Sequence, residues 1–351
     1  FGATSVNPHY GTPKNPWNAR CIPGGSSGGS AVAVAASLCL GALGTDTGGS
    51  IRIPSSLCGT VGLKPTYGRV STSGVYPLSW SLDHVGPMTK SVRDAAILLQ
   101  SLAGRDPRDA NSSSEPVPDY LSIREDVRGL RAGVPSDFYF ENCDPEVRDH
   151  VMQALEVLKE AGVIIEEVSI PHLKHATTAG LVILLAEAAS QHENYLKGSQ
   201  SQDYGKDVRG LLKSGTFVTA TQYIKAQRVR SVMRKEFLKA FELVDVLITP
   251  GLPVVAPKME QDSVTISGKR ETVRSALTRV MRPYNLTGLP AIVLPCGFSR
   301  SGLPVALQIA GRPFEETTIL AVAQAYEEHT PWHEKRPSIE APEGSPPNNS
   351  R

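Results

Sequence analysis

Between Gly129 and Ile170, apolar residues follow a strand, helix, strand pattern. In the middle segment the apolar positions recur every three or four residues, the spacing of one face of a helix, and the segment ends at a glycine. A short apolar run on either side is typical of a buried strand. The pattern therefore predicts a strand at Leu130 to Val134, a helix marked by Val147, Val151, Leu155 and Leu158, and a strand at Val163 to Ile170.

The last third of the chain shows the same alternation. A long helix is predicted over about Thr219 to Leu243, since apolar residues lie three and four positions apart along one face. Beyond it, short β-rich runs predict buried strands, and a final amphipathic segment predicts a helix. These later elements are the strands Val246 to Thr249, Ala291 to Pro295 and Val305 to Ile309, and the helix Glu315 to Glu328.

The remaining segments are typical of connections. Phe1 to Arg20, Asp106 to Pro118 and Lys197 to Asp207 are expected to be loops, and residues 252–272 are expected to form an insertion or flap. None of them is long or polar enough to demand a domain boundary, and the sequence contains no internal repeat. We therefore expect one α/β domain.

Composition and charge narrow the function classes. The chain has 351 residues, of which 40% are hydrophobic and 20% charged, enough to bury a large core. Its 36 Lys and Arg nearly balance 35 Asp and Glu, so no global field favours nucleic acid or an anionic membrane. No apolar run reaches the roughly 18 residues that span a bilayer. The 5 cysteines are scattered and odd in number, which argues against a disulfide or zinc framework and predicts a reduced, cytoplasmic setting.

Two serine clusters flanked by glycine pairs carry the candidate chemistry. The first lies at Gly24 to Ser30 and the second at Thr45 to Ser50. Glycine permits backbone angles that other residues avoid and leaves successive N–H groups unshielded, so such a loop can cradle an oxyanion beside a serine nucleophile. Gly-Ser runs are usually flexible linkers. Here the apolar stretch Ala31 to Leu43 joins the clusters, with a helix expected from about Gly29, which indicates a folded site.

Other catalytic motifs fit only parts of this region. Gly25 to Gly29 satisfies G-x-S-x-G, the nucleophile elbow of α/β-hydrolases, but no hydrophobic strand precedes it. No Gly-Lys-Ser/Thr follows the glycines, which excludes a P-loop. Asp46 to Gly48 matches the D-T-G of aspartic proteases, yet paired carboxylates need two copies, which only a homodimer would supply. His84 beside Asp83 suggests a Ser-His-Asp triad, but we expect this histidine to pack or to hydrogen-bond instead.

Taken together, these clusters resemble the amidase signature family of serine hydrolases. The similarity extends over most of Phe1 to Pro337. It implies an α/β/α sandwich with a mixed central β-sheet, formed by a single domain over residues 1–337, and leaves 338–351 as a disordered tail. The motifs that carry the resemblance, in the family's order and spacing, are Pro23 to Ala31, Gly44 to Arg52, Gly62 to Arg69, Ser81 to Pro87, Asn285 to Ala291 and Gly302 to Pro304.

The resemblance also implies a Ser-cisSer-Lys mechanism. Ser50 would be the nucleophile, and Ser26, after a cis peptide bond with Gly25, would relay its proton to a neutral lysine. The family uses no metal or organic cofactor, so none is expected here. The resemblance further implies an oxyanion hole from the backbone amides of Thr47, Gly48, Gly49 and Ser50, and a supporting role for Asp46, Arg52 and Ser27.

The base lysine departs from the family pattern. The family's lysine lies several tens of residues before the first serine cluster, and the segment before Ser26 is too short to hold it. Lys14 is too close to the cluster, and Lys64 matches a family position that is not the base, so a structural role is expected for it. The first residue is Phe1, not Met. We therefore expect the chain to begin inside a longer protein, to lack the N-terminal part of the domain, and to be nearly inactive by itself.

The signature leaves the substrate open. In one branch of the family, the A subunit of glutamyl-tRNA amidotransferase, an acid and an arginine hold the free amino acid glutamine. We align Thr278 with the acid, and Gly210 or Leu211 with the arginine, so neither group is present here. The segments expected to build the acyl pocket are Ala179 to Phe217, Pro253 to Glu271 and the helix near Leu277 to Tyr284.

The expected function is therefore an amide hydrolase that acts on a small carboxylic amide through a serine acyl-enzyme. Two alternatives stay open: the glutaminase A subunit of a glutamyl-tRNA amidotransferase, and a non-catalytic remnant of the fold. A small-molecule amide is the expected partner. Nucleic acid is expected only under the amidotransferase alternative, a membrane is not expected, and a homodimer is compatible with the sequence.

Overall fold

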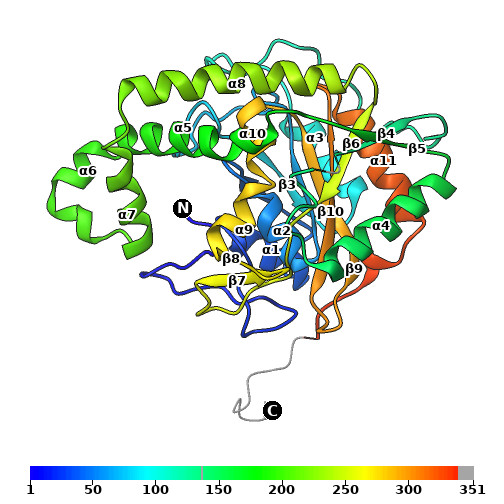
Figure 1. The fold of residues 1–351 in the computed structure, drawn as a ribbon, viewed down its shortest axis with the longest axis horizontal. Helices are drawn as coiled ribbons and strands as arrows, with labels where there is room; N and C mark the ends of the chain where they lie inside the picture. The colour runs from blue at the N-terminus through cyan, green and yellow to red at the C-terminus, as the bar shows by residue number, and fades with distance from the viewer. Residues whose placement is uncertain (136, 339–351) are drawn as a thin grey trace, which may run out of the picture.

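A mixed β-sheet forms the centre of the molecule in the computed structural model, which describes residues 1–135 and 137–338 (Figure 1). The described residues place 8 strands in this sheet. In the order in which they lie side by side, they are β1 (Gly41–Thr45), β3 (Val85–Thr89), β2 (Val61–Lys64), β9 (Ala291–Phe298), β10 (Pro304–Gly311), β6 (Val246–Pro250), β4 (Arg131–Pro135) and β5 (Ile164–Val168).

The strand directions follow from the connections. Neighbouring strands run antiparallel from β1 to β6, whereas β4 pairs in parallel with both β6 and β5. A short turn joins β9 to β10, as an antiparallel hairpin requires, whereas α4 (Pro145–Glu160) provides the crossover that the parallel pair β4 and β5 needs. Every residue of β10 is buried, which fits a sequence that is apolar except for Gln308.

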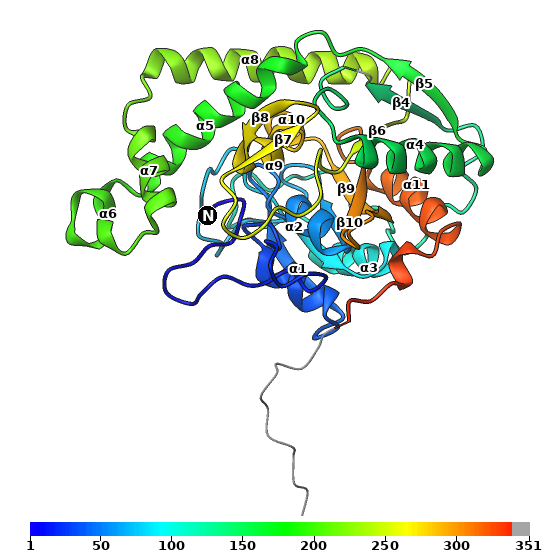
Figure 2. The ribbon, with the colours of Figure 1, turned by 60° about the horizontal axis from the view of Figure 1, so that its bottom comes forward.

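Helices cover the sheet in two layers, which confirms the predicted α/β class with a mixed central sheet (Figure 2). One layer contains α1 (Gly28–Ala35) and α2 (Arg52–Cys58), and α2 packs on β2, β9 and β10. The other contains α3 (Val92–Leu102), α4 and α11 (Glu316–Glu328); α11 contacts both of these helices as well as β9 and β10. The middle of the sheet is therefore the centre of the core.

Two long helices lie side by side along one edge of the molecule, α5 (Ala176–Gln191) and α8 (Ala220–Ala240) (Figures 1 and 2). α8 begins with a capping box. The Thr219 side chain accepts from the Gln222 backbone amide, and the Gln222 side chain accepts from the Thr219 backbone amide. The shorter elements are α6 (Glu193–Lys197), α7 (Lys206–Gly215), α9 (Val273–Arg279), α10 (Arg282–Thr287), and the 3₁₀ turns η1 (Leu173–His175), η2 (Ser199–Gln202) and η3 (Trp332–Glu334).

The periodic segments of the sequence are confirmed as elements, and two of the predicted connections differ. The predicted loop Lys197 to Asp207 contains η2 and the first residues of α7, whose apolar face shows only from Val208 onward. The predicted insertion at 252–272 contains a small hairpin of β7 (Ser263–Ile266) and β8 (Lys269–Thr272). The predicted tail lies outside the described residues from 339 onward.

Candidate active site

The two serine loops lie against each other. β1 leads directly into the second loop, and α2 begins just after Ser50. The Ser27 amide donates to the Ser50 carbonyl at 3.1 Å. The Ser27 hydroxyl donates to the Thr45 carbonyl at 3.3 Å and accepts from the Thr45 amide at 3.2 Å. Ser27 therefore joins the two loops through both its backbone and its side chain.

Ser26 follows a cis peptide bond with Gly25, the bond that the resemblance implied. A Cβ on Gly25 would lie 2.6 Å from the Gly2 carbonyl oxygen, so a larger residue does not fit at this position. The Ser26 carbonyl accepts from the Ser5 hydroxyl at 3.4 Å. Ser26 therefore lies in a closely packed stretch of backbone, directly before Ser27, which contacts Ser50.

Asp46 organises the second loop from inside. Its Oδ1 accepts from the Gly49 amide at 2.7 Å and its Oδ2 from the Ile51 amide at 3.3 Å. Burial alone would raise the pKa of the Asp46 carboxyl, but the charge and hydrogen bonds of Arg52 bring that pKa below its usual range. The carboxylate therefore stays ionised in a fully buried place and holds the turn that presents Ser50.

Arg52 ties this loop to two distant segments. It forms a fully buried ion pair with Asp46, Nε to Oδ2 at 3.0 Å. Its Nη1 donates to Gln308 on β10 at 2.7 Å, and its Nη2 donates to Asn285 on α10 at 2.7 Å. Nη2 also donates to the Met281 carbonyl at 3.1 Å. All three nitrogens of this guanidinium therefore have acceptors, as a buried arginine requires.

Three of the four backbone amides expected in the oxyanion hole have no acceptor among the described residues. The amides of Thr47, Gly48 and Ser50 have no hydrogen-bond acceptor among the described residues. The Gly49 amide already donates to Asp46, so it is not free to bind an oxyanion and we remove it from the set. Gly49 has a φ of 120°, a conformation that favours glycine, and its role is to shape the turn.

The Asp83 and His84 pair does not form a Ser-His-Asp arrangement. His84 Nδ1 lies 2.7 Å from the Leu82 carbonyl, and Asp83 accepts instead from the Thr47 hydroxyl at 2.5 Å. Burial lowers the pKa of His84 well below its ordinary value and raises the pKa of Asp83. The histidine therefore packs and hydrogen-bonds as expected, and Asp83 anchors the Thr47 side chain.

Lys64 is a buried structural lysine. Its Nζ donates to the Leu289 carbonyl at 2.5 Å and to the Pro65 carbonyl at 3.1 Å. Burial lowers its pKa well below the ordinary value, and the nearby charge of Arg52 lowers it further. Both acceptors are backbone groups, so this lysine joins β2 to the segment before β9, in line with the structural role expected from the sequence.

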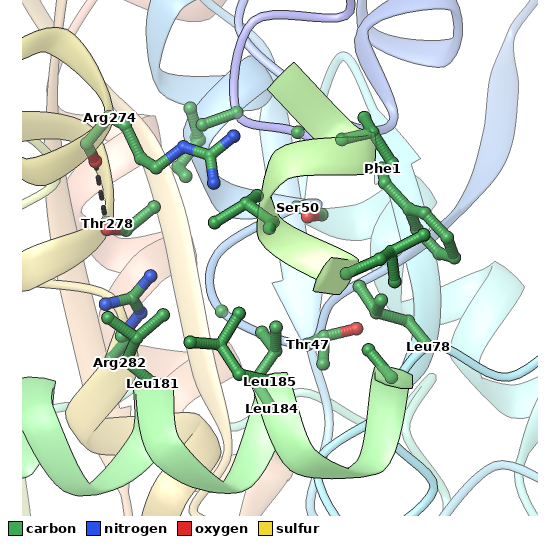
Figure 3. A pocket seen from close by; sticks show the side chains of 18 residues that line it. Phe1, Thr47, Ser50, Leu78, Leu181, Leu184, Leu185, Arg274, Thr278 and Arg282 are labelled. Atoms are coloured by element: carbon green, nitrogen blue, oxygen red, sulfur yellow. Dashed lines mark hydrogen bonds between the residues drawn. The ribbon is translucent and has the colours of Figure 1, made fainter. Parts of the chain in front are cut away.

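A cavity opens in front of Ser50 (Figure 3). Its walls come from α5, α7 and the segment from α9 to α10, together with Leu78 and residues 1–3. The predicted pocket segments at 179–217 and 277–284 do contribute, but no residue of Pro253 to Glu271 lines the cavity. The lining residues are Phe1, Gly2, Ala3, Thr47, Gly48, Ser50, Ile53, Leu78, Leu181, Leu184, Leu185, Ala188, Val208, Leu211, Leu212, Arg274, Thr278 and Arg282.

The cavity brings together part of the predicted site and adds two arginines. Thr47, Gly48 and Ser50 line it, whereas the other predicted site residues do not. Sequence reasoning missed Arg274 and Arg282. For Arg282 a signal was present, since it interrupts an apolar run that extends from Val280 to Leu286, but nothing in the sequence showed that it faces Ser50.

Comparison with known proteins identifies one family. A family model described as Amidase matches residues 1–320. The chain belongs to the amidase family. This amidase is 44% identical over 361 residues to the A subunit of the glutamyl-tRNA(Gln) amidotransferase of Syntrophobacter fumaroxidans, covering 96% of this chain and 73% of that protein.

Solved structures show the same fold. The structure of the corresponding A subunit from Thermotoga maritima aligns with a TM-score of 0.80 at 38% identity, covering 95% of this amidase and 72% of that chain. A second structure, described as an amidase, aligns with a TM-score of 0.85 at 38% identity, covering 93% and 71% of the two chains. The family consists of hydrolases of C–N amide bonds, which places this protein in the amidase class. None of the described helices is long and apolar enough to cross a membrane.

Proposed function

We propose that this amidase hydrolyses a small carboxylic amide, with Ser50 as the nucleophile. One observation carries the proposal: Ser50 faces a cavity beside the amides of Thr47 and Gly48, which have no acceptor among the described residues. Such unpaired donors stabilise the oxyanion that forms when a hydroxyl attacks an amide carbonyl. The buried network of Asp46 and Arg52 supports this geometry by fixing the loop.

The reaction proceeds in two balanced steps. The Ser50 oxygen bonds to the carbonyl carbon, the C–N bond breaks, and the amine leaves with a proton. Water then attacks the ester, which releases the carboxylic acid and restores the hydroxyl. We assign the proton relay to Ser26 and the base to a lysine, as in the family's Ser-cisSer-Lys mechanism; among the described residues, no lysine lines the cavity.

A second candidate is the glutamine-hydrolysing component of an amidotransferase. It is favoured by relatives named as the A subunit of glutamyl-tRNA(Gln) amidotransferase, such as that of Geobacter metallireducens, which is 40% identical over 97% of this chain. Against it, no carboxylate among the described residues lines the cavity to pair with the ammonium of glutamine, and Thr278 occupies the position aligned with the acid. The named relatives support this second candidate better than the first, whereas the charges that line the described cavity favour the stand-alone amide hydrolase, which we keep as the proposal.

A fluorophosphonate probe tests the nucleophile directly. We expect covalent labelling of the intact protein, loss of labelling in Ser50→Ala, and full labelling in Ser101→Ala, which removes an exposed serine on α3. Peptide mapping of the adduct should return the peptide with Ser50. Labelling that persists in Ser50→Ala would reject the assignment, and a protein that takes no label and cleaves no amide would favour a non-catalytic remnant.

A further inference from the structure

Arg282 is a buried cation without a partner among the described residues. It is the first residue of α10, and 8% of its surface is exposed. Its Nε has no hydrogen-bond partner, and no described residue forms an ion pair or a hydrogen bond with its guanidinium. Burial lowers the pKa of Arg282 to about 10, and the nearby charge of Arg274 contributes. Burying such a group is costly unless something pairs with it.

The other buried arginines show how the fold normally satisfies this group. Arg52 has acceptors for all three of its nitrogens, including the carboxylate of Asp46. Arg69 lies 3.7 Å from the Glu316 carboxylate and donates to the carbonyls of Glu115 and Pro116 at 3.0 Å. Among the described residues Arg282 has neither kind of partner, which leaves its guanidinium available to a ligand in the cavity that it lines.

The position of Arg282 is next to the proposed oxyanion hole. A Cβ placed on Gly48 would lie 3.7 Å from both Cγ and Nε of Arg282, so this side chain passes directly over the loop. Figure 3 shows the guanidinium groups of Arg282 and Arg274 on the same side of the cavity, with Ser50 and Thr47 across from them. A ligand held by Arg282 would therefore reach Ser50.

The charge of this cavity is one-sided. Arg274 lines it too, and its single ion pair, Nη2 to Asp207 Oδ2, is long at 3.8 Å. Asp207 does not line the cavity and its side chain is 46% exposed, so it screens Arg274 weakly and does not reach Arg282. The described lining contains two arginines and no carboxylate.

Most of the remaining lining is apolar. Leucines of α5 and α7 make up much of it, namely Leu181, Leu184, Leu185, Leu211 and Leu212. Thr278 uses its hydroxyl to donate to the Arg274 carbonyl at 2.9 Å, which leaves it no free donor for a ligand. The cavity therefore suits a short methylene chain with an anionic end.

We propose that Arg282, with Arg274 beside it, binds a carboxylate on the acyl part of the substrate, so that this amidase acts on mono-amides of short dicarboxylic acids. The inference rests on the proposed function of Ser50. In glutaramate, for example, the carboxylate pairs with Arg282, the methylenes lie against the leucines, and the amide carbonyl reaches Ser50. Ser50 takes the acyl group, ammonia leaves, and water releases glutarate, so atoms and charge balance without any co-reactant.

The same geometry disfavours glutamine, which differs from glutaramate only by an α-ammonium group. That cation would lie close to the carboxylate it accompanies, and therefore close to two arginines, with no acid in the described lining to pair with it. A site that leaves a charged ligand group unpaired rejects that ligand by orders of magnitude. We expect kcat/KM for glutamine to be at least about 100-fold below that for glutaramate.

The kinetic test compares glutaramate with glutaramide, a neutral molecule of the same shape. Wild-type protein should favour glutaramate, and Arg282→Gln should lower kcat/KM for glutaramate by about 100-fold while changing that for glutaramide less than threefold. Arg274→Gln should have a smaller effect in the same direction. Arg270→Gln, which removes the same charge from an exposed residue of β8, is the matched control and should change neither substrate.

A binding test separates failure of this inference from failure of the proposed function. In Ser50→Ala, glutarate should bind detectably by calorimetry and butyrate should not, and Arg282→Gln on that background should abolish glutarate binding. Equal binding of glutarate with and without Arg282 would overturn the inference, as would a preference for glutamine over glutaramate. If Ser50→Ala abolishes hydrolysis while the wild type cleaves glutaramate and glutaramide equally well, the proposed function stands and the carboxylate-binding role of Arg282 is rejected.

Stability provides a readout that a structural arginine would not give. Because Arg282 has no partner among the described residues, Arg282→Met should raise Tm by about 2 °C or more while losing activity on glutaramate. A decrease in Tm with a parallel loss of activity on glutaramate and glutaramide would assign Arg282 a packing role and reject its carboxylate-binding role.

Discussion

Asp46 and Arg52 form an ion pair in which neither side chain is exposed, with Nε and Oδ2 3.0 Å apart. The two residues lie on either side of Ser50 in the chain, so their contact closes the loop that presents this serine. Asn285 on α10 reinforces the pair by donating to Asp46 Oδ1 at 2.8 Å. The position of the candidate nucleophile therefore depends on a polar network within the core, beneath the cavity.

Asp46→Asn should destabilise the fold strongly. The substitution leaves Arg52 buried without its counter-charge, and breaking a buried pair in this way costs about 3 to 5 kcal/mol. Urea unfolding at pH 7 measures the loss. Asp126→Asn is the control. Asp126 Oδ2 and Arg128 Nη2 form an exposed ion pair at 2.9 Å, so this change should have no measurable effect on stability.

The same carboxylate predicts a loss of stability in acid. The folded protein holds the pKa of Asp46 below its usual range, so the stabilisation is present above about pH 4 and is lost as the pH falls through the folded pKa. Unfolding free energies from pH 6 to pH 2 test this. Comparison of the wild type with Asp46→Asn isolates the contribution, and parallel curves for the two would contradict it.

Gly49→Ala should damage both stability and activity. The φ of 120° at Gly49 is unfavourable for alanine, and the added Cβ would lie 2.8 Å from Met281. We expect a loss of about 2 to 4 kcal/mol in unfolding free energy. Gly74→Ala is the matched control, since Gly74 has a φ of 83° with nothing within 4 Å. An equal cost at both sites would show that the contact with Met281 is unimportant.

Glu327 should make stability fall as the pH rises. Burial raises the pKa of this carboxyl from 4.5 to about 7, although the Val92 amide donates to it. The folded state therefore keeps a proton that the unfolded state releases, and the stabilisation is lost between about pH 4.5 and 7. Glu327→Gln should remove this dependence and raise the unfolding free energy at pH 8 by about 3 kcal/mol. Glu242→Gln, which removes an exposed carboxyl just after α8, should leave the pH profile unchanged.

One cysteine should react much faster than the others. Cys39 is partly exposed beyond α1, whereas Cys21, Cys58, Cys143 and Cys296 are buried. Burial also raises the pKa of Cys143 to about 11, which lowers its thiolate fraction. Titration of the native protein with a disulfide reagent should release one fast equivalent, and Cys39→Ser should abolish it. Two or more fast equivalents in the native protein would show that the core opens more readily than this packing implies.

The sequence was sufficient where local chemistry decides the structure. The helix α8 and the strands β9 and β10 follow from apolar periodicity and turn residues, because each buries a continuous face. β1 and α3 were not anticipated. β1 has alternating small residues and no apolar pattern, and its place at the sheet edge comes from pairing with β3.

The sequence by itself determined that two Gly-Ser loops build a site around Ser50, because glycine geometry and unshielded amides are local properties. Only the tertiary structure decided which amides are free, since Asp46 takes that of Gly49. It also decided that Arg282, far away in the sequence, lies buried over Gly48 with no partner in the part of the chain that the structure describes. Whether a charged group finds a partner depends on every segment packed around it, and no local pattern encodes that.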